Sequence, residues 1–265
     1  MVRYLKMDIY RMITSWQFYV GAIGIGFLYL FGGYQGRYIQ SVYSSYFYNG
    51  FFSTAIMAYA FCCISFAGCF IEDSEYHYWN QVVQKGSLRC YAWSKTITCF
   101  LSGVCTMVLG ILLFVFMLRL RVPFLQEEYI VGGQREGDTF GFLIYSDTVL
   151  LYFICSAAFC GMLGGILAVV SAYLSLYEKN RLFTICIAVV GFYFLENFLT
   201  SNLDLPEFFN IWVIYGAGYS LFGNSCQNIV YAIFVAILFI CVFGFFIEKK
   251  LKEEIRGLGD KARAN

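Results

Sequence analysis

The chain has 265 residues, of which 60% are hydrophobic and only 13% are charged. Soluble domains carry about a quarter charged residues, so this composition excludes an ordinary soluble protein. The formal net charge of +1 gives no global attraction to nucleic acid, and the length suits one membrane domain without a second, soluble domain.

Six long apolar runs follow one another along the chain, separated by short polar segments. They cover roughly residues 16–31, 50–71, 96–118, 148–173, 182–200 and 229–247. Most are close to the ~20 residues that a helix needs to cross ~30 Å of hydrocarbon. We therefore expect an all-α polytopic membrane protein with six transmembrane helices, which form a single transmembrane domain over residues 1–265.

The basic residues are distributed unevenly between the two sides of the predicted spans. If the amino terminus is cytoplasmic, fourteen Lys and Arg residues fall on cytoplasmic segments, and only Arg37, Arg119, Arg121 and Arg135 fall on outer segments. Positively charged residues are enriched in cytoplasmic loops. The pattern predicts that both termini are cytoplasmic in a multi-pass protein of the cell (plasma) membrane.

Residues 1–15 precede the first run but have a helical pattern of their own. Apolar side chains recur on one face, at Val2, Leu5, Ile9, Met12, Ile13 and Trp16. This pattern is typical of an amino-terminal interfacial helix that lies in the headgroup plane. The alternative is a simple extension of the first span.

A tyrosine-rich segment over residues 32–50 separates the first two runs. Tyrosine prefers the membrane–water interface, where its ring is buried and its hydroxyl stays hydrated. We expect a short outer loop with a belt of aromatic side chains.

Residues 72–95 form the one cytosolic segment that has a structural pattern of its own. Ser74 is a candidate N-cap among acidic residues, and Lys85-Gly86 is a typical helix end. We predict a short amphipathic coupling helix between spans 2 and 3 that docks a cytosolic partner; the alternative is a helix that rests on lipid. The candidate contact residues are Glu72, Asp73, Glu75, Tyr78, Trp79, Val82, Val83 and Arg89.

The segment over residues 119–147 is longer and of mixed charge. Gly132, Gly133 and Gly137 favour a turn-rich outer loop. In the following run, Ala157, Gly161 and Gly165 recur at intervals of four and form a stripe of small residues that lets helices approach closely. Packing within one subunit and dimerisation explain this stripe equally well.

The last third of the chain contains one intramembrane acid and a broken apolar segment. Glu196 lies near the outer end of the fifth run, where it is either functional or within reach of interfacial water. Residues 201–228 are apolar but interrupted by Pro206 and several glycines, which predicts an outer or re-entrant helical element before span 6. Residues 248–265 form a basic cytosolic tail, with opposite charges at helical neighbours such as Glu248 and Lys252.

Several kinds of catalytic motif are absent from the sequence. It has no GxxxxGK[ST] loop for nucleotides and no GxSxG nucleophile elbow, and His77 is its only histidine. We therefore expect no catalytic, metal or cofactor site, and we expect the chain not to be an enzyme.

The layout resembles the membrane subunits (permeases) of type-2 ATP-binding-cassette (ABC) exporters. The resemblance covers the interfacial helix, the six spans, the coupling helix and the broken outer element. Its sharpest local match is an acid closing the second span, an apolar helix, a Ser-x-Arg turn and a Lys opening the third span. Here these are Glu72, Val82/Val83, Ser87-x-Arg89 and Lys95, without the family's usual Gly after the acid and without its Pro.

The resemblance implies a function and partners. A separate cytosolic ABC ATPase subunit would bind the ATP and dock on residues 72–95 and on the interfacial helix. A second permease would complete a homo- or heterodimer near spans one and five, and an amphipathic substrate such as a peptide, drug or lipid-like molecule would be exported. The alternative is a membrane-embedded immunity or accessory protein that binds a ligand without transporting it.

Overall fold

The computed structural model describes residues 1–34, 41–51, 53–76, 78, 87–125, 138–145, 148–202, 206–216, 218 and 220–264. Over these residues the fold is all-helical, without strands. The helices are α1 (Val2–Thr14), α2 (Trp16–Tyr34), α3 (Val42–Phe51), α4 (Ser53–Ile64), α5 (Cys69–Glu75), α7 (Leu88–Arg119), α8 (Gly141–Tyr145), α9 (Val149–Leu174), α10 (Arg181–Asn202), η2 (Glu207–Phe209), α11 (Ile211–Tyr215) and α12 (Ser225–Ala264).

Five helical segments in the described residues are long and apolar enough to cross a membrane, as in a multi-pass membrane protein. They are Thr54–Glu75, Leu88–Arg119, Val149–Leu174, Arg181–Phe198 and Ser225–Ile255. The pair α1 and α2 forms a sixth candidate if it is counted as one span, although its two helices are bent by 56°. The six predicted runs therefore correspond to five or six candidate spans.

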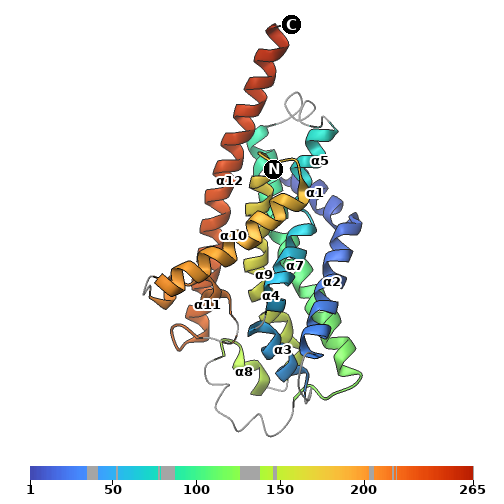
Figure 1. Ribbon diagram of the computed structural model, residues 1–265, viewed down its shortest axis with the longest axis vertical. Coiled ribbons are helices and arrows are strands. Elements are labelled where there is room, and N and C mark those ends of the chain that lie inside the picture. The colour runs from blue at the N-terminus through green and yellow to red at the C-terminus, as the bar shows by residue number, and fades with distance from the viewer. Residues whose placement is uncertain are drawn as a thin grey trace.

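The long helices form an elongated bundle, with both termini toward the same end (Figure 1). Helix α7 packs against both α9 and α2, and α4 contacts α2, α7, α9 and α10. Helix α12 runs beside α7 and α9 and then continues beyond the bundle. The chain has only two prolines, and neither interrupts a helix: Pro123 follows α7 and Pro206 precedes η2. Proline is tolerated at such ends because it cannot donate a helical hydrogen bond.

The close contact between α7 and α9 depends on glycine. A Cβ atom at Gly165 would lie 2.6 Å from the carbonyl oxygen of Phe100, and one at Gly103 would lie 2.7 Å from the backbone of Gly165. A Cβ atom at Gly161 would lie 3.1 Å from the backbone of Val104. In this structure, the small-residue stripe that includes Ala157 and Gly161 thus faces α7 of the same chain, which favours packing within one subunit over dimerisation.

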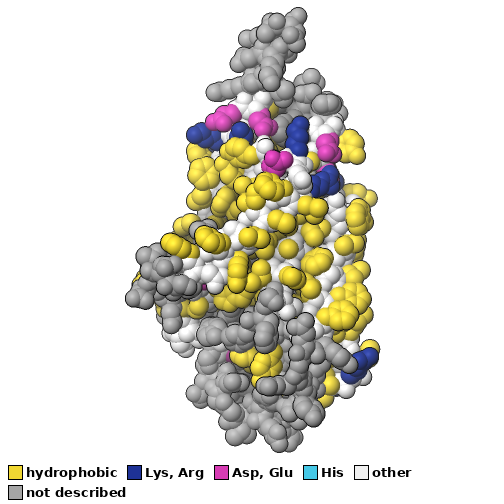
Figure 2. Space-filling model, in the orientation of Figure 1, with side chains coloured by type: hydrophobic (Ala, Val, Ile, Leu, Met, Phe, Trp, Pro, Cys, Tyr) yellow, Lys and Arg dark blue, Asp and Glu magenta, His cyan; other side chains and the backbone are white. Residues whose placement is uncertain are grey.

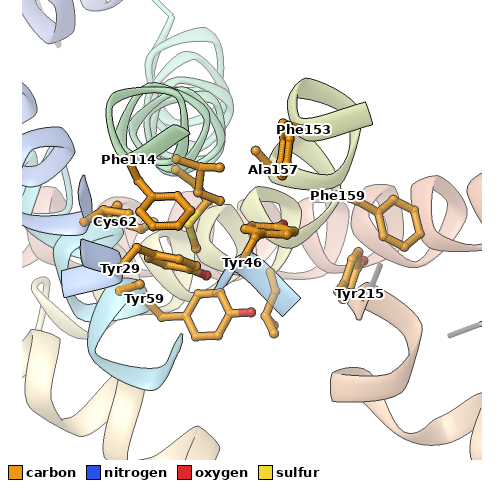
Figure 3. Close-up of a cluster of buried hydrophobic side chains, with 14 of the residues drawn as sticks. Tyr29, Tyr46, Tyr59, Cys62, Phe114, Phe153, Ala157, Phe159 and Tyr215 are labelled. Carbon is orange, nitrogen blue, oxygen red and sulfur yellow. The ribbon is translucent and has the colours of Figure 1, made fainter. Parts of the chain in front are cut away.

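The predicted outer loop of tyrosines is wrong for the part that the structure describes. Val42–Phe51 is helix α3, and Tyr43 and Tyr46 are buried in the bundle instead of forming an interfacial belt. The Tyr46 hydroxyl lies 2.8 Å from Oγ of Ser156 in α9, so a partner inside the protein replaces water. Figure 3 shows Tyr46 beside Tyr29 of α2 and Tyr59 of α4 in this part of the core.

The remaining predicted segments fall partly within the described residues. In the segment 119–147, Gly141–Tyr145 forms helix α8, whereas Gly132, Gly133 and Gly137 lie outside the described residues. The segment 201–228 contains two short helices, η2 and α11. In the predicted tail, Lys252 Nζ lies 2.5 Å from Oε1 of Glu248, which confirms the expected pair, and α12 continues as helix to Ala264.

Charged side chains gather toward one end of the bundle. Figure 2 shows Lys, Arg, Asp and Glu side chains near the end that carries α1 and α5, and apolar side chains over the middle of the same face. We call this end the charged end; α8 and α11 lie at the opposite end (Figure 1). An apolar middle with charges beside it is the distribution that a bilayer requires.

Candidate functional site

A buried ammonium group lies at the centre of the charged end. Lys95 is near the start of α7, and its Nζ lies 2.9 Å from Oδ2 of Asp73 and 3.1 Å from Oδ1 of Asp8. The three side chains are at most 3% exposed. Because Asp73 belongs to α5 and Asp8 to α1, a single lysine joins three helices.

Two hydroxyl groups of α7 add to these contacts. Tyr91 Oη donates a hydrogen bond of 2.5 Å to Oδ2 of Asp73, and Ser94 Oγ donates one of 2.6 Å to Oδ2 of Asp8. Tyr91, Ser94 and Lys95 are spaced by three and four residues, which places them on one helix face. Hydrogen bonds to a carboxylate are stronger than those between neutral groups, so they offset part of the cost of burying the two acids.

A second group of ion pairs involves the acids of α5 and is partly exposed. Arg11 of α1 donates from Nη1 to Oδ1 of Asp73 at 2.9 Å, and its Nη2 lies 3.7 Å from Oε2 of Glu72. Arg181, the first residue of α10, lies 3.0 Å from Oε1 of Glu72 and 3.8 Å from Oε2 of Glu75. These contacts extend the charged cluster to a fourth helix.

Together these side chains form what we call the ionic network. Its members are Asp8, Arg11, Glu72, Asp73, Glu75, Lys95 and Arg181. Its inner part is electrically balanced, because Lys95 and Arg11 face Asp8 and Asp73. Each buried ion loses several kcal/mol of hydration, and removal of one partner leaves an uncompensated charge that costs about 3–5 kcal/mol. The network therefore specifies one arrangement of α1, α5, α7 and the start of α10.

Local sequence features place these side chains together. Asp8 and Met12 are spaced by four, and they are the buried residues of α1. A break over residues 65–68 separates α4 from α5, and Gly68 in this break leaves room for the side chain of Arg181, whose Cδ would lie 3.3 Å from a Cβ at that position. The break thus lets α10 begin beside the acids of α5.

The network contains part of the predicted docking segment. Glu72, Asp73 and Glu75 are all members. Tyr78 lies beside it: its hydroxyl donates to Sδ of Met7 at 3.7 Å. Burial and, next, the nearby carboxylate of Asp73 raise the pKa of the Tyr78 hydroxyl.

Other predicted docking residues lie elsewhere. Arg89 does not join the network; its side chain is 74% exposed and lies 3.7 Å from Glu248 of α12. Trp79, Val82 and Val83 fall outside the described residues, as does most of the predicted coupling helix. The prediction of Ser74 as an N-cap is wrong, because Ser74 lies inside α5, which already begins at Cys69 after the break.

The sequence pattern missed most of the residues that pair with these acids. The pattern does not predict Asp8, Arg11 and Arg181 as site residues, and it indicates Lys95 only through the family resemblance. One signal was available for Asp8: it is spaced from Leu5 by three and from Met12 by four, so it lies on the apolar face of its helix. An acid at such a position needs a buried partner.

Glu196 lies away from the charged end, in the last part of α10. Its carboxylate accepts a hydrogen bond from the side chain of Asn210. Asn210 also caps α11, because its Oδ1 accepts from the backbone N–H of Val213 at 2.9 Å. Glu196 thus contributes to joining the end of α10 to α11.

The side chains of the ionic network are suited to holding helices together. In the part of the chain that the structure describes, no group of three or more His, Cys, Asp or Glu side chains is arranged to hold a metal ion. Each charged group of the network faces an opposite charge, which stabilises the ionised forms and holds helices together.

The chain was also compared with known proteins. No protein-family model matches it, and the searches of curated proteins and of solved structures found no match.

Proposed function

We propose that this chain is the membrane permease subunit of an ATP-driven ABC exporter in the cell membrane, with ATP bound and hydrolysed by a separate cytosolic subunit. The observation that carries this proposal is the ionic network, because it links α1, α5, α7 and α10 through residues at both ends of the segment 72–95, which resembles the family's coupling region. In this proposal the charged end faces the cytoplasm, in agreement with the distribution of basic residues.

The network supplies a path for force from the ATPase into the membrane. An ATPase docked on α1 and on residues 72–95 would push on helices that are already joined by Lys95 and Asp73. Helix α7 packs along α9 and α2, so displacement of its first turns would move the centre of the bundle. The pairs of Arg181 with Glu72 and Glu75 would carry the same displacement to α10.

Helix α10 is suited to respond to such a displacement. Only 18% of the apolar 18-residue stretch of α10 is buried inside the chain, against 50% of the corresponding stretch of α7 and 67% of that of α9. In the dimer that we propose, α2 and α10 lie near the second permease, and their exposed apolar side chains, such as Phe31 and Phe194, contact the partner or lipid. Such an uncharged, aromatic surface suits an amphipathic cargo, such as a peptide, drug or lipid-like molecule, better than a hydrophilic ion.

The docking assignment can be tested by co-purification. We expect the double variant Trp79→Ala/Val83→Asp to insert into the membrane at the wild-type level and to lose at least tenfold of the co-purifying ATPase, because a charge replaces an apolar contact. The matched control is Phe208→Ala/Phe209→Asp at the opposite end, where both side chains are exposed. This control should retain the ATPase.

The result separates the proposed function from its alternative. Wild-type co-purification by Trp79→Ala/Val83→Asp would contradict the docking surface. If the unmodified chain binds no ATPase in its native membrane, and vesicles containing it show no nucleotide-dependent transport, the chain is instead a binding protein of the immunity or accessory kind.

A further inference from the structure

A patch of tyrosine and lysine side chains lies where α9 ends and α12 leaves the bundle. The hydroxyls of Tyr173 and Tyr177 are 2.8 Å apart, and Nζ of Lys250 lies 4.3 Å from the centroid of the Tyr177 ring. Tyr177 is 57% exposed. The patch therefore presents one ammonium group and two hydroxyl groups to a ligand that approaches from outside the bundle.

Aromatic side chains continue this patch toward the middle of the bundle. The Tyr173 ring lies 5.8 Å from that of Phe243 and 6.1 Å from that of Phe246. Phe246 is 43% exposed, and only 17% of the apolar 18-residue stretch of α12 is buried inside the chain. The ammonium group of Lys250 and the exposed apolar surface of Phe243 and Phe246 thus lie within two turns of α12.

The patch lies at the level where the sequence of α12 changes from apolar to charged residues. The apolar run ends at Ile247, and Glu248, Lys249 and Lys250 follow. Basic residues next to the end of a span attract anionic lipids, by about 1 kcal/mol for each Lys or Arg near the surface. Tyrosine prefers the same interfacial depth.

These features fit an anionic phospholipid better than a zwitterionic one. A phosphodiester accepts hydrogen bonds from an ammonium group and from the one hydroxyl hydrogen that the Tyr173–Tyr177 pair leaves free, and the acyl chain of the same lipid can lie along Phe246 and Phe243. A choline headgroup would need a free aromatic face for its cation. The face of Tyr177 is already covered by Lys250.

An acidic side chain faces the same place and competes with a bound headgroup. The carboxylate of Glu254 interacts electrostatically with both Lys250 and Lys179. Glu253 interacts in the same way with Tyr173. Neutralising Glu254 would remove a negative charge that acts on both Lys250 and Lys179, and should strengthen the attraction of an anion.

We propose that the patch of Tyr173, Tyr177 and Lys250 is a binding site for the headgroup of an anionic phospholipid, with Phe243 and Phe246 in contact with its acyl chain. The site is separate from the ionic network, and its existence does not depend on transport. It would fix the depth and rotation of α12 at the membrane surface.

The test is native mass spectrometry of the full chain, released from nanodiscs that contain either phosphatidylglycerol or phosphatidylcholine. We expect retained phosphatidylglycerol on the wild type, about fivefold weaker retention on Lys250→Gln, and stronger retention on Glu254→Gln. The matched control is Arg119→Gln, because Cζ of Arg119 lies 4.7 Å from the ring centroid of Phe124 near the opposite end. This control should retain the lipid as the wild type does.

Two outcomes would overturn the proposal. One is equal loss of phosphatidylglycerol from Lys250→Gln and Arg119→Gln, which would indicate unspecific attraction to basic side chains. The other is displacement of the lipid by millimolar inorganic phosphate, which would indicate a site for a free anion. Retention of phosphatidylglycerol in the presence of phosphate, with loss only in Lys250→Gln, supports a lipid site.

Discussion

The two ends of the bundle bury polar side chains in different ways. At the charged end, helices are joined by ions: Lys95 contacts two carboxylates and is inaccessible to solvent. Toward the opposite end, α3 is joined to α2 and α9 by neutral groups: the Tyr46 hydroxyl contacts Ser156, and the side-chain amide of Asn49 donates to the backbone oxygen of Tyr29 at 2.8 Å. The buried acid described there, Asp138, accepts a hydrogen bond of 2.7 Å from the neutral hydroxyl of Tyr152.

This difference determines how each end can respond to force. An ion in a dry interior cannot leave its partner without a large penalty, whereas a neutral hydroxyl loses about 1 kcal/mol when its bond breaks. The charged end should therefore move as a unit. The neutral contacts near the opposite end can rearrange at lower cost, as the proposed export function would require.

The largest effect is expected from Lys95→Met, which leaves Asp8 and Asp73 buried without their shared cation. We expect a loss of about 3–5 kcal/mol in the free energy of unfolding, seen as a lower thermal midpoint in detergent. The double variant Lys95→Met/Asp8→Asn should recover part of this loss, because the remaining acid, Asp73, still faces Arg11 at 2.9 Å. A wild-type midpoint for Lys95→Met would show that the buried ion pairs do not form.

A smaller loss is expected from Gly165→Ala. The new methyl group would meet the backbone oxygen of Phe100 at 2.6 Å, so α7 and α9 must separate, at a cost of about 1–3 kcal/mol. The control is Gly191→Ala in α10, where no atom of the described chain lies within 4 Å of the added group. Equal thermal midpoints for the two variants would contradict the close contact.

The contacts near the opposite end are tested by Tyr46→Phe, which removes the hydroxyl that contacts Ser156. We expect a loss of about 1 kcal/mol in stability, measured by the same thermal scans. Tyr59→Phe is the matched control, because Tyr59 is buried in the same core cluster, where its ring lies 6.0 Å from that of Trp212. An equal loss of stability in Tyr46→Phe and Lys95→Met would contradict the difference between the two ends.

The smallest effect is expected from Arg181→Gln. Its side chain is 37% exposed, and exposed ion pairs contribute about 0.2–1 kcal/mol and are screened by salt. The shift in thermal midpoint should therefore shrink in about 1 M salt, where the screening length falls to about 3 Å, whereas the shift caused by Lys95→Met should persist. Equal salt dependence of the two variants would show that Lys95 is accessible to ions.

The sequence predicted the helical spans well because hydrophobicity is a local property. Each of the six apolar runs contributes to a helix, and the break before span 6 contains short helices. Tyr43 and Tyr46 were misplaced because interfacial preference is only an average, and the partner of Tyr46 comes from a span more than a hundred residues away.

The ionic network was harder to foresee because it depends on how distant segments meet. Asp8, Asp73 and Lys95 belong to three helices, and Asp73 and Lys95 appear in the sequence as ordinary charges next to an apolar run. Charge counting assigned Lys95 and Arg11 to one side of the membrane but could not pair them with acids. These groups meet because α1 packs against the start of α7 and because α5 brings Asp73 to the same lysine.

The length of α12 has a consequence for experiments on motion in this protein. Its 40 residues span about 60 Å, roughly twice the thickness of the hydrocarbon layer. The part after Glu248 projects about 24 Å past the apolar run as a straight rod, as Figure 1 shows beyond the bundle. A fluorophore on the final turn would therefore magnify any tilt of this helix, and could register motion inside the bilayer without a label in the bilayer itself.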